Sequence, residues 1–160
     1  MSKKISIAID AMGGDNSPDK TIEGIKLFLD KNSKKNDFII NVFGNEDAIN
    51  DKLRKYKINF DYVKIIHTST IVSDEETPLT AIKNSKNTSM WKCIEHQLQG
   101  KSDISLSAGN TGVLLVISRM ILKMMKEVNK PALAGLWPSQ KGSAVVLDLG
   151  ANIDCNDQNL

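Results

Sequence analysis

The chain has 160 residues, of which 41% are hydrophobic and 25% are charged, and its formal net charge is +2 at pH 7. This length is typical of one globular domain, and the apolar content is that of a chain that folds, which excludes an intrinsically disordered protein. The nearly balanced charge argues against a dedicated nucleic-acid-binding protein. We therefore expect a single folded unit over residues 1–160 that has no nucleic-acid partner.

The cysteines and the N-terminus predict a cytoplasmic protein. Cys93 and Cys155 lie far apart without a Cys-x-x-Cys pattern, which favours reduced thiols over a disulfide framework. The apolar run at residues 5–9 is too short for the hydrophobic region of a signal peptide, and no cleavage site follows it. The longest apolar stretch, Val113–Met125, is interrupted by polar residues and is too short to span a bilayer.

In chain order, the first part of the sequence alternates short apolar runs with helical patterns. It predicts a strand at Ile5–Asp10, a helix with Ser17 as its N-cap, a strand at Phe38–Phe43, a helix at Glu46–Tyr56 and a strand at Tyr62–His67. The apolar runs are ended by glycine or polar residues, as buried strands usually are. The serine followed by proline is a typical helix start.

The second part of the sequence continues this alternation. It predicts a helix from about Leu79 to Gly100, interrupted at Asn87–Ser89, a strand at Asp103–Ser107, a very apolar helix ending near Asn129, and strands at Ala132–Trp137 and Ser143–Leu149. The interruption is expected because asparagine, threonine and serine compete with the helical backbone for hydrogen bonds. The last two strands are joined by a short link, and therefore should form an antiparallel hairpin.

This order of elements predicts the fold class. Strands that alternate with helices form a mainly parallel sheet with helices on both faces. We therefore expect an α/β protein with a Rossmann-like sheet and a C-terminal antiparallel hairpin. In such sheets ligands bind beside the carboxyl ends of the strands, so polar and glycine-rich segments that follow a strand are the candidate sites.

The first candidate segment follows the first predicted strand and contains Asp10, Gly13, Gly14 and Asp15. Adjacent glycines allow the backbone to approach a ligand closely, and the carboxylates can orient a polar ligand. A tight turn between a strand and a helix explains the same residues equally well. The segment is not a Gly-x-Gly-x-x-Gly motif, so it does not predict a dinucleotide site.

The second candidate segment is Ser107–Gly112, at the start of the very apolar helix. Gly109 and Gly112 leave the backbone amides accessible, and Asn110 and Thr111 add polar side chains. Amides at a helix N-terminus are unpaired and lie at the positive end of the helix dipole, which favours an anion such as phosphate. The segment is not a Walker P-loop, and a neutral helix cap is the alternative interpretation.

Two weaker candidates complete the set. Asp148 and Asn152 follow the last predicted strand and would face the same edge of the sheet if that strand is central. Lys86 and Ser89 lie at the predicted helix interruption, where a lysine beside a hydroxyl can neutralise an anion. The alternative for the lysine is an ordinary solvent-exposed helix face.

Several familiar catalytic arrangements are absent from the sequence. His67 closes a strand and is expected to be a packed or capping residue, whereas His96 lies within a helix and is expected to be exposed. Cys93 has no evident partner base, there is no Gly-x-Ser-x-Gly motif, and no cluster has metal-ligand spacing. We therefore expect chemistry that uses an incoming nucleophile rather than a protein side chain.

Together these segments resemble a known family. The sequence is similar to the bacterial phosphate acyltransferase (PlsX) family in five motifs that follow in the family's order, namely Ile7–Asp15, Pro78–Met90, Ser107–Gly112, Lys130–Ala134 and Leu147–Cys155. Ser85 departs from the family pattern, which usually has a basic residue there. The chain corresponds to about the N-terminal half of the family's catalytic domain, whose fold is like that of isocitrate and isopropylmalate dehydrogenases.

The resemblance implies a reaction and a set of roles. A fatty acyl group moves from acyl carrier protein to inorganic phosphate, giving acyl phosphate for phospholipid synthesis, without a metal or organic cofactor. It implies catalytic roles for Lys86, Ser89, Asn110, Asp148 and Asn152, and substrate binding by Asp10, Gly13, Gly14, Asp15, Gly109, Thr111 and Gly112. It also implies a homodimer that associates peripherally with the inner face of the cell membrane.

Two other functions remain open from the sequence. One is a phosphate acetyltransferase-like enzyme that uses coenzyme A thioesters, because the reaction and the architecture are related. The other is a catalytically incomplete fragment that retains only phosphate binding or an oligomer interface. Because the helix after Gly112 is so apolar, we also expect the isolated chain to self-associate.

Overall fold

The structure is a computed structural model that describes residues 4–32, 37–73, 75, 77–128, 130–147 and 149. It divides into two compact units, residues 1–122 and residues 123–160. The expectation of one folded unit over residues 1–160 stays a prediction. Among the described residues, no helix is both long enough and apolar enough to cross a membrane.

The first unit is built on a parallel sheet. Its strands are β1 (Ile5–Asp10), β2 (Phe38–Gly44), β3 (Val63–His67) and β4 (Ile104–Ser107), in the spatial order β3-β2-β1-β4. All three pairings are parallel. The predicted parallel sheet is therefore confirmed, with strand bounds within one residue of those expected.

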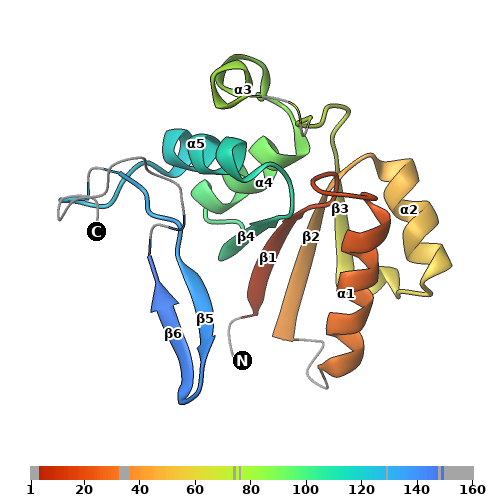
Figure 1. Ribbon diagram of the computed structural model, residues 1–160. Coiled ribbons are helices and arrows are strands. Elements are labelled where there is room, and N and C mark those ends of the chain that lie inside the picture. The colour runs from red at the N-terminus through yellow and green to blue at the C-terminus, as the bar shows by residue number, and fades with distance from the viewer. Residues whose placement is uncertain are drawn as a thin grey trace. The chain divides into compact units, whose positions relative to one another are not determined.

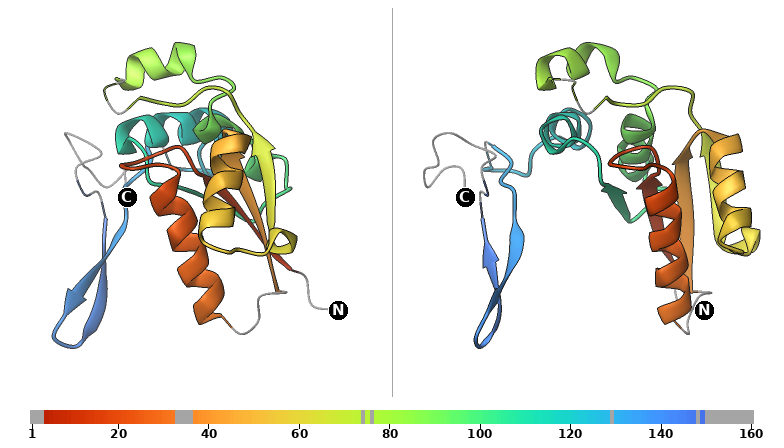
Figure 2. Two further views of the ribbon diagram at one scale, coloured as in Figure 1. Left: turned by 90° about the vertical axis from the view of Figure 1, so that its right-hand side faces the viewer. Right: turned by 45° about the vertical axis from the view of Figure 1, so that its right-hand side comes forward.

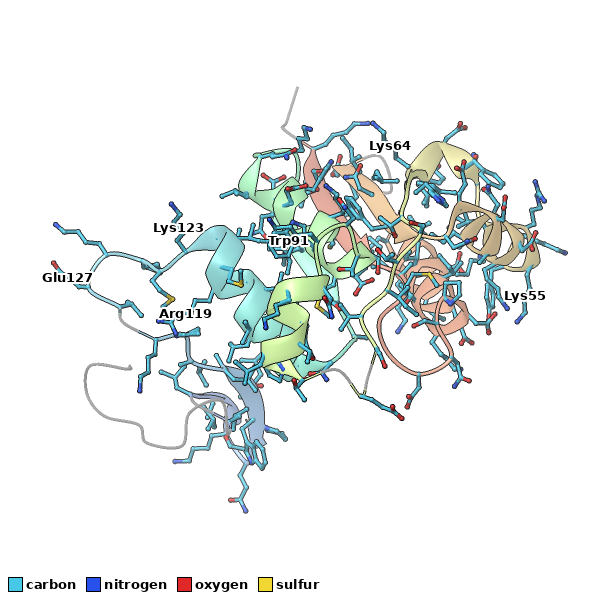
Figure 3. The ribbon with its side chains drawn as sticks, turned by 90° about the horizontal axis from the view of Figure 1, so that it is seen from above. Lys55, Lys64, Trp91, Arg119, Lys123 and Glu127 are labelled. Carbon is cyan, nitrogen blue, oxygen red and sulfur yellow. The ribbon has the colours of Figure 1, made fainter. Side chains whose placement is uncertain are left out.

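Helices cover both faces of this sheet, as predicted. Figures 1 and 2 show α1 (Asp19–Lys31) and α2 (Glu46–Lys55) on one face and α4 (Ser89–Leu98) on the other. The helices α3 (Pro78–Asn84) and α5 (Thr111–Leu122) lie on the α4 side, and α5 packs against α4. In Figure 3, Trp91 of α4 lies between Arg119 of α5 and Lys55 of α2.

Apolar side chains at helical spacing explain the packing of each face. Ile22, Ile25 and Leu29 share one side of α1 and are buried against the sheet. On the other face, a cluster of Met90, Ile94, Val113, Ile117 and Ile121 joins α4 to α5. The Val113–Ile117–Ile121 spacing is one residue per helical turn, so the apolar face of α5 is buried within this unit.

The strand order creates a reversal at the middle of the sheet. The chain runs from β1 outward through β2 to β3, and then crosses to the other side of β1 to form β4. The segments that follow β1 and β4 therefore leave the sheet side by side, as Figure 1 shows. In open α/β sheets this position is where ligands bind.

Of three predictions about helix ends, one is confirmed and two are wrong. The predicted interruption is confirmed, because α3 ends at Asn84 and α4 begins at Ser89 with Thr88 as its N-cap. Ser17 is not the N-cap of α1, because its hydroxyl donates to the carbonyls of Gly13 and Gly14 instead. The apolar helix ends at Leu122 rather than near Asn129, because Lys123 takes a left-handed conformation, with φ 63°.

The second unit contains the predicted antiparallel hairpin. Its strands are β5 (Gly135–Ser139) and β6 (Gly142–Val146), paired from Gly135 opposite Val146 to Ser139 opposite Gly142. Gly142 has a φ of 130°, which a glycine adopts without strain in a tight turn. Both strands are shorter than the sequence predicted, and each strand also begins or ends at a different residue.

Candidate functional site

The loops after β1 and β4 are packed against each other at the reversal of the sheet. A Cβ atom on Gly13 would lie 2.7 Å from the amide nitrogen of Gly109, and one on Gly14 would lie 2.7 Å from the carbonyl oxygen of Ala108. Gly14 also has a left-handed φ of 85°. Glycine is therefore required at both positions, because any side chain would separate the two loops.

Asp10 and Ser107 connect the two strands at this point. They lie opposite each other in the β1–β4 register, and the Ser107 hydroxyl donates to Asp10 Oδ2 over 2.7 Å. The other carboxylate oxygen, Oδ1, accepts from the Met12 amide over 3.1 Å. Asp10 is only 2% exposed. Its carboxylate is therefore occupied by protein partners in this structure.

The first turn of α5 lies next to these loops. The Asn110 side chain accepts from the Val113 amide over 3.1 Å, so it caps the helix, and the Gly109 amide donates to Ser107 Oγ over 3.1 Å. Within the described residues, the amides of Thr111 and Gly112 have no acceptor. No acidic residue lies in this turn. The helix start thus offers two amides and the positive end of the helix dipole to an anion.

The starts of two other helices adjoin this turn. A Cβ on Gly109 would lie 2.9 Å from the Met90 methyl group of α4, and one on Gly112 would lie 3.4 Å from Pro78 Cγ of α3. Ser89, the first residue of α4, is 1% exposed, and its amide donates to the Thr70 carbonyl.

For the remaining predicted site residues, the described part of the structure gives no contact with the start of α5. Lys86 is exposed in the link between α3 and α4 and forms no ion pair with the described residues. Asp15 is exposed in the loop after β1. Asp148 and Asn152 lie outside the described residues, so their predicted roles stay predictions.

The two histidines have different structural roles, His67 at the end of β3 and His96 on α4. His67 caps α2, because its Nδ1 accepts from the Glu46 amide over 3.2 Å, as expected of a capping residue. The expectation that His96 is exposed was wrong. Its Nδ1 is 2.7 Å from Ser102 Oγ and its ring packs edge-on against Phe43. Burial, and then nearby lysines, lowers the pKa of His96 below its ordinary value of 6.5.

No described side chain stands out as a nucleophile or a metal centre. Burial raises the pKa of the Cys93 thiol to about 12, which keeps it protonated at neutral pH. Among the described residues, no group of three or more histidine, cysteine, aspartate or glutamate residues is arranged to hold a metal ion. The site can bind and orient an anion through backbone amides, and the chemistry must come from the bound molecules.

Sequence reasoning did not find two features of this site. The Asp10–Ser107 contact joins residues 97 positions apart. The signal available was that each residue ends a strand, but only the strand order places β4 beside β1. The contact of Met90 with Gly109 was also missed, because methionine at that position is explained equally well by the core of α4.

Comparison with known proteins gives consistent matches. A family model described as fatty acid synthesis protein matches residues 5–160. A phosphate acyltransferase of Pelagibacter ubique is 49% identical over 160 residues, which is 100% of this chain and 46% of the relative. A phosphate acyltransferase of Azorhizobium caulinodans is 37% identical over 161 residues, covering 100% of this chain and 44% of the relative.

A third relative extends the same pattern. The phosphate acyltransferase of Paramagnetospirillum magneticum is 36% identical over 160 residues, with 100% of this chain and 45% of the relative covered. The chain thus spans less than half the length of these curated relatives. The family match nevertheless covers almost the whole chain, from β1 onward. The chain therefore belongs to the fatty acid synthesis protein family.

Proposed function

We propose that this chain carries the phosphate-binding part of a phosphate acyltransferase, which moves a fatty acyl group from a thioester to inorganic phosphate. The observation that carries the proposal is the open first turn of α5, where the amides of Thr111 and Gly112 have no acceptor among the described residues. The turn lies at the reversal of the sheet, where ligands of α/β proteins bind. The names of the relatives support the same reaction.

The proposed reaction needs no protein nucleophile. An oxygen of hydrogen phosphate attacks the thioester carbonyl carbon, the new C–O bond forms, and the C–S bond breaks with its electron pair going to sulfur. The proton of hydrogen phosphate ends on the released thiol, so atoms and charges balance. A thiol is a good leaving group because its pKa is about 8.5. The protein therefore acts by positioning both reactants and by stabilising negative charge.

The residues of the site take different parts in this proposal. Thr111 and Gly112 bind phosphate oxygens through their amides, and Asn110 holds the helix start in place. The exposed Lys86 side chain offsets negative charge from the link before α4. The loop containing Gly14 and Asp15 borders the side on which the thioester enters. Asp148 and Asn152 are proposed to complete the edge of the site.

The identity of the carrier is a further part of the proposal. We infer acyl carrier protein as the thioester carrier, because carriers of this kind are strongly acidic and the chain has abundant exposed lysines. A homodimer in the cytoplasm, associated peripherally with the membrane, follows from the resemblance alone. Coenzyme A thioesters are the alternative carrier, and a panel of both carriers at two acyl lengths separates them.

The test measures acyl phosphate release directly. The chain is incubated with acyl-acyl carrier protein and inorganic phosphate, and acyl phosphate is trapped with hydroxylamine as the hydroxamate. We expect release that saturates with phosphate, and a higher KM for phosphate in Asn110→Ala. Turnover of Asn110→Ala with an unchanged phosphate dependence would sink the assignment of this site.

Phosphate binding without turnover is the second candidate function. It is favoured by one observation, namely that the chain spans less than half of its curated relatives. It predicts saturable phosphate binding at α5 and no hydroxamate with either carrier. Release of acyl phosphate by the 160-residue chain would refute it.

A further inference from the structure

The buried Asp10 carboxylate has a different environment from that of a group that binds substrate. Both of its oxygens are used inside the protein, one by the Met12 amide and one by the Ser107 hydroxyl. With 2% of its surface exposed, Asp10 offers no face to a ligand in this structure. Ser107 in turn accepts from the Gly109 amide, so the ends of β1 and β4 and the loop after β4 are joined by one continuous hydrogen-bonded chain.

The direction of each hydrogen bond in this chain is fixed by chemistry. A serine hydroxyl has one hydrogen to donate, and a backbone amide can only donate. Because the Gly109 amide donates to Ser107 Oγ over 3.1 Å, the hydrogen of the hydroxyl is left for Asp10 Oδ2 at 2.7 Å. The carboxylate therefore orients the hydroxyl, and the hydroxyl orients the Gly109 amide.

The surrounding backbone leaves little freedom for this chain to move. A Cβ on Gly13 would lie 2.8 Å from Asp10 Oδ2 as well as 2.7 Å from the Gly109 nitrogen. One on Gly109 would lie 3.2 Å from the Gly13 Cα atom. The loops are thus in direct contact around the hydrogen bonds, and a shift of one loop must be transmitted to the other.

We propose that Asp10 and Ser107 are positioning residues, which together with the Gly109 amide form a loop clamp that sets the direction of the Thr111 and Gly112 amides. Gly109 lies one residue before Asn110, the N-cap of α5, so its orientation determines how the chain enters the helix. The role of this clamp in binding phosphate rests on the proposed function, whereas the coupling of the two loops rests on the contacts alone. Asp10 is thereby assigned to the framework of the site instead of to substrate contact.

The test compares Asp10→Asn, Ser107→Ala and the double variant in the 160-residue chain. Amide hydrogen exchange of Gly109 is followed by NMR, and inorganic phosphate binding is measured by titration. Asp10→Asn keeps the size of the side chain and does not touch Gly109 directly. We nevertheless expect Gly109 exchange to become about tenfold faster in each single variant, the size of one lost charge-assisted hydrogen bond.

The double variant and two controls separate an effect of the loop clamp from a general effect of substitution. Because the residues act in series, the double variant should exchange no faster than either single variant. Ser107→Thr keeps the hydroxyl and should restore slow exchange and phosphate affinity. Ser105→Ala removes another β4 serine, whose hydroxyl bonds Gln97, and should change neither measurement. Phosphate affinity should fall about tenfold in parallel with the exchange in the single variants.

Each contrary result has a distinct meaning. Unchanged Gly109 exchange in Asp10→Asn, or additive effects in the double variant, would overturn the loop clamp. Faster exchange with unchanged phosphate affinity would overturn its positioning role. If the unmodified chain binds no phosphate, the proposed function fails, while the exchange measurement still decides the coupling of the loops. Ser107→Ala removes only one oxygen atom, so it supplies the measurement if Asp10→Asn does not fold.

Discussion

Two helices begin at the same edge of the parallel sheet, and their first turns differ in charge and in the amides that are bonded to protein groups. At α2, the Asn45 side chain accepts from the Ala48 amide over 2.9 Å, and His67 Nδ1 accepts from the Glu46 amide over 3.2 Å. Glu46 and Asp47 add carboxylates to this turn. Two amides at the start of α2 are therefore bonded to protein side chains, and its carboxylates repel an added anion.

The start of α5 has the same asparagine cap, but it lacks the second side-chain acceptor and the carboxylates. Asn110 caps it through the Val113 amide, but the turn contains no acidic residue, and Thr111 and Gly112 keep their amides unpaired among the described residues. Both helices follow a parallel strand, so following a strand does not by itself explain the difference. The residues of the first turn decide whether a helix start is closed or can receive an anion.

The largest expected effect comes from giving α5 the carboxylate that α2 has. Gly112→Asp should weaken inorganic phosphate binding at least about 100-fold. The new carboxylate would repel a phosphate bound at the same helix start, and two charges about 4 Å apart near a protein surface repel each other by several kcal/mol. It should not destabilise the fold, because an acidic residue favours a helix start. A Cβ at this position meets Pro78 at 3.4 Å and Asn110 at 3.5 Å, which are ordinary contacts.

Gly112→Asn is the matched control for this change. It has nearly the same shape without the charge, so it should lose much less affinity in the same calorimetric titration. Equal losses in the two variants would show that space, and not charge, limits binding at α5.

The next effect tests the close contact of the two loops at the site. Gly13→Ala places a methyl group 2.7 Å from the Gly109 nitrogen, so we expect a loss of about 1–3 kcal/mol in the free energy of unfolding. Gly24→Ala is the control, because a Cβ there meets nothing within 4 Å and alanine favours the helix by about 0.5–1 kcal/mol. Urea denaturation measures both, and similar stabilities of the two variants would contradict the described packing.

A third change opens the closed helix. Asn45→Ala removes the cap of α2 and should lower the free energy of unfolding by about 1 kcal/mol, as measured by thermal denaturation. Phosphate affinity should stay the same, because α2 is not part of the site. A phosphate affinity that changes with Asn45→Ala would place the binding site elsewhere along this edge.

The smallest effect concerns His96, which lies on α4 and packs against Phe43 of β2. Burial lowers the pKa of His96 in the folded state below its ordinary value of 6.5, so the unfolded chain binds a proton more readily. Stability from this residue is therefore complete above pH 6.5 and is lost as the pH falls below that value. His96→Gln should remove this part of the pH dependence of denaturation, while phosphate affinity at constant pH stays unchanged. If His96→Gln has the same pH dependence of denaturation as the unmodified chain, His96 does not contribute to it.

The sequence predicted the elements well because their signals are local. Apolar runs ended by glycine identify β1 and β2, and the Asn87–Ser89 segment identifies the interruption between α3 and α4. Local signals also predicted that a helix starts after Asn110, and the structure confirms this start at Thr111. Strand order depends on contacts across the sheet, and no local pattern contains it.

The contacts that the sequence did not predict join residues far apart in the chain, or replace one hydrogen-bond partner by another. The substrate-binding role of Asp10 stays a prediction, whereas its bond to Ser107 was not predicted, because only the β1–β4 pairing supplies this partner. Ser17 has the right chemistry for an N-cap, but its hydroxyl bonds the Gly13 and Gly14 carbonyls instead. His96 is half-buried because Ser102 and Phe43 lie beside it in the folded unit.

One NMR titration tests the contrast between the two helix starts most directly. Inorganic phosphate is added to the isotope-labelled 160-residue chain, and backbone amide shifts are followed. We expect saturable shifts at Thr111 and Gly112 of α5 and none at Glu46 and Ala48 of α2. Equal shifts at both helices, or no saturable shift at α5, would contradict it.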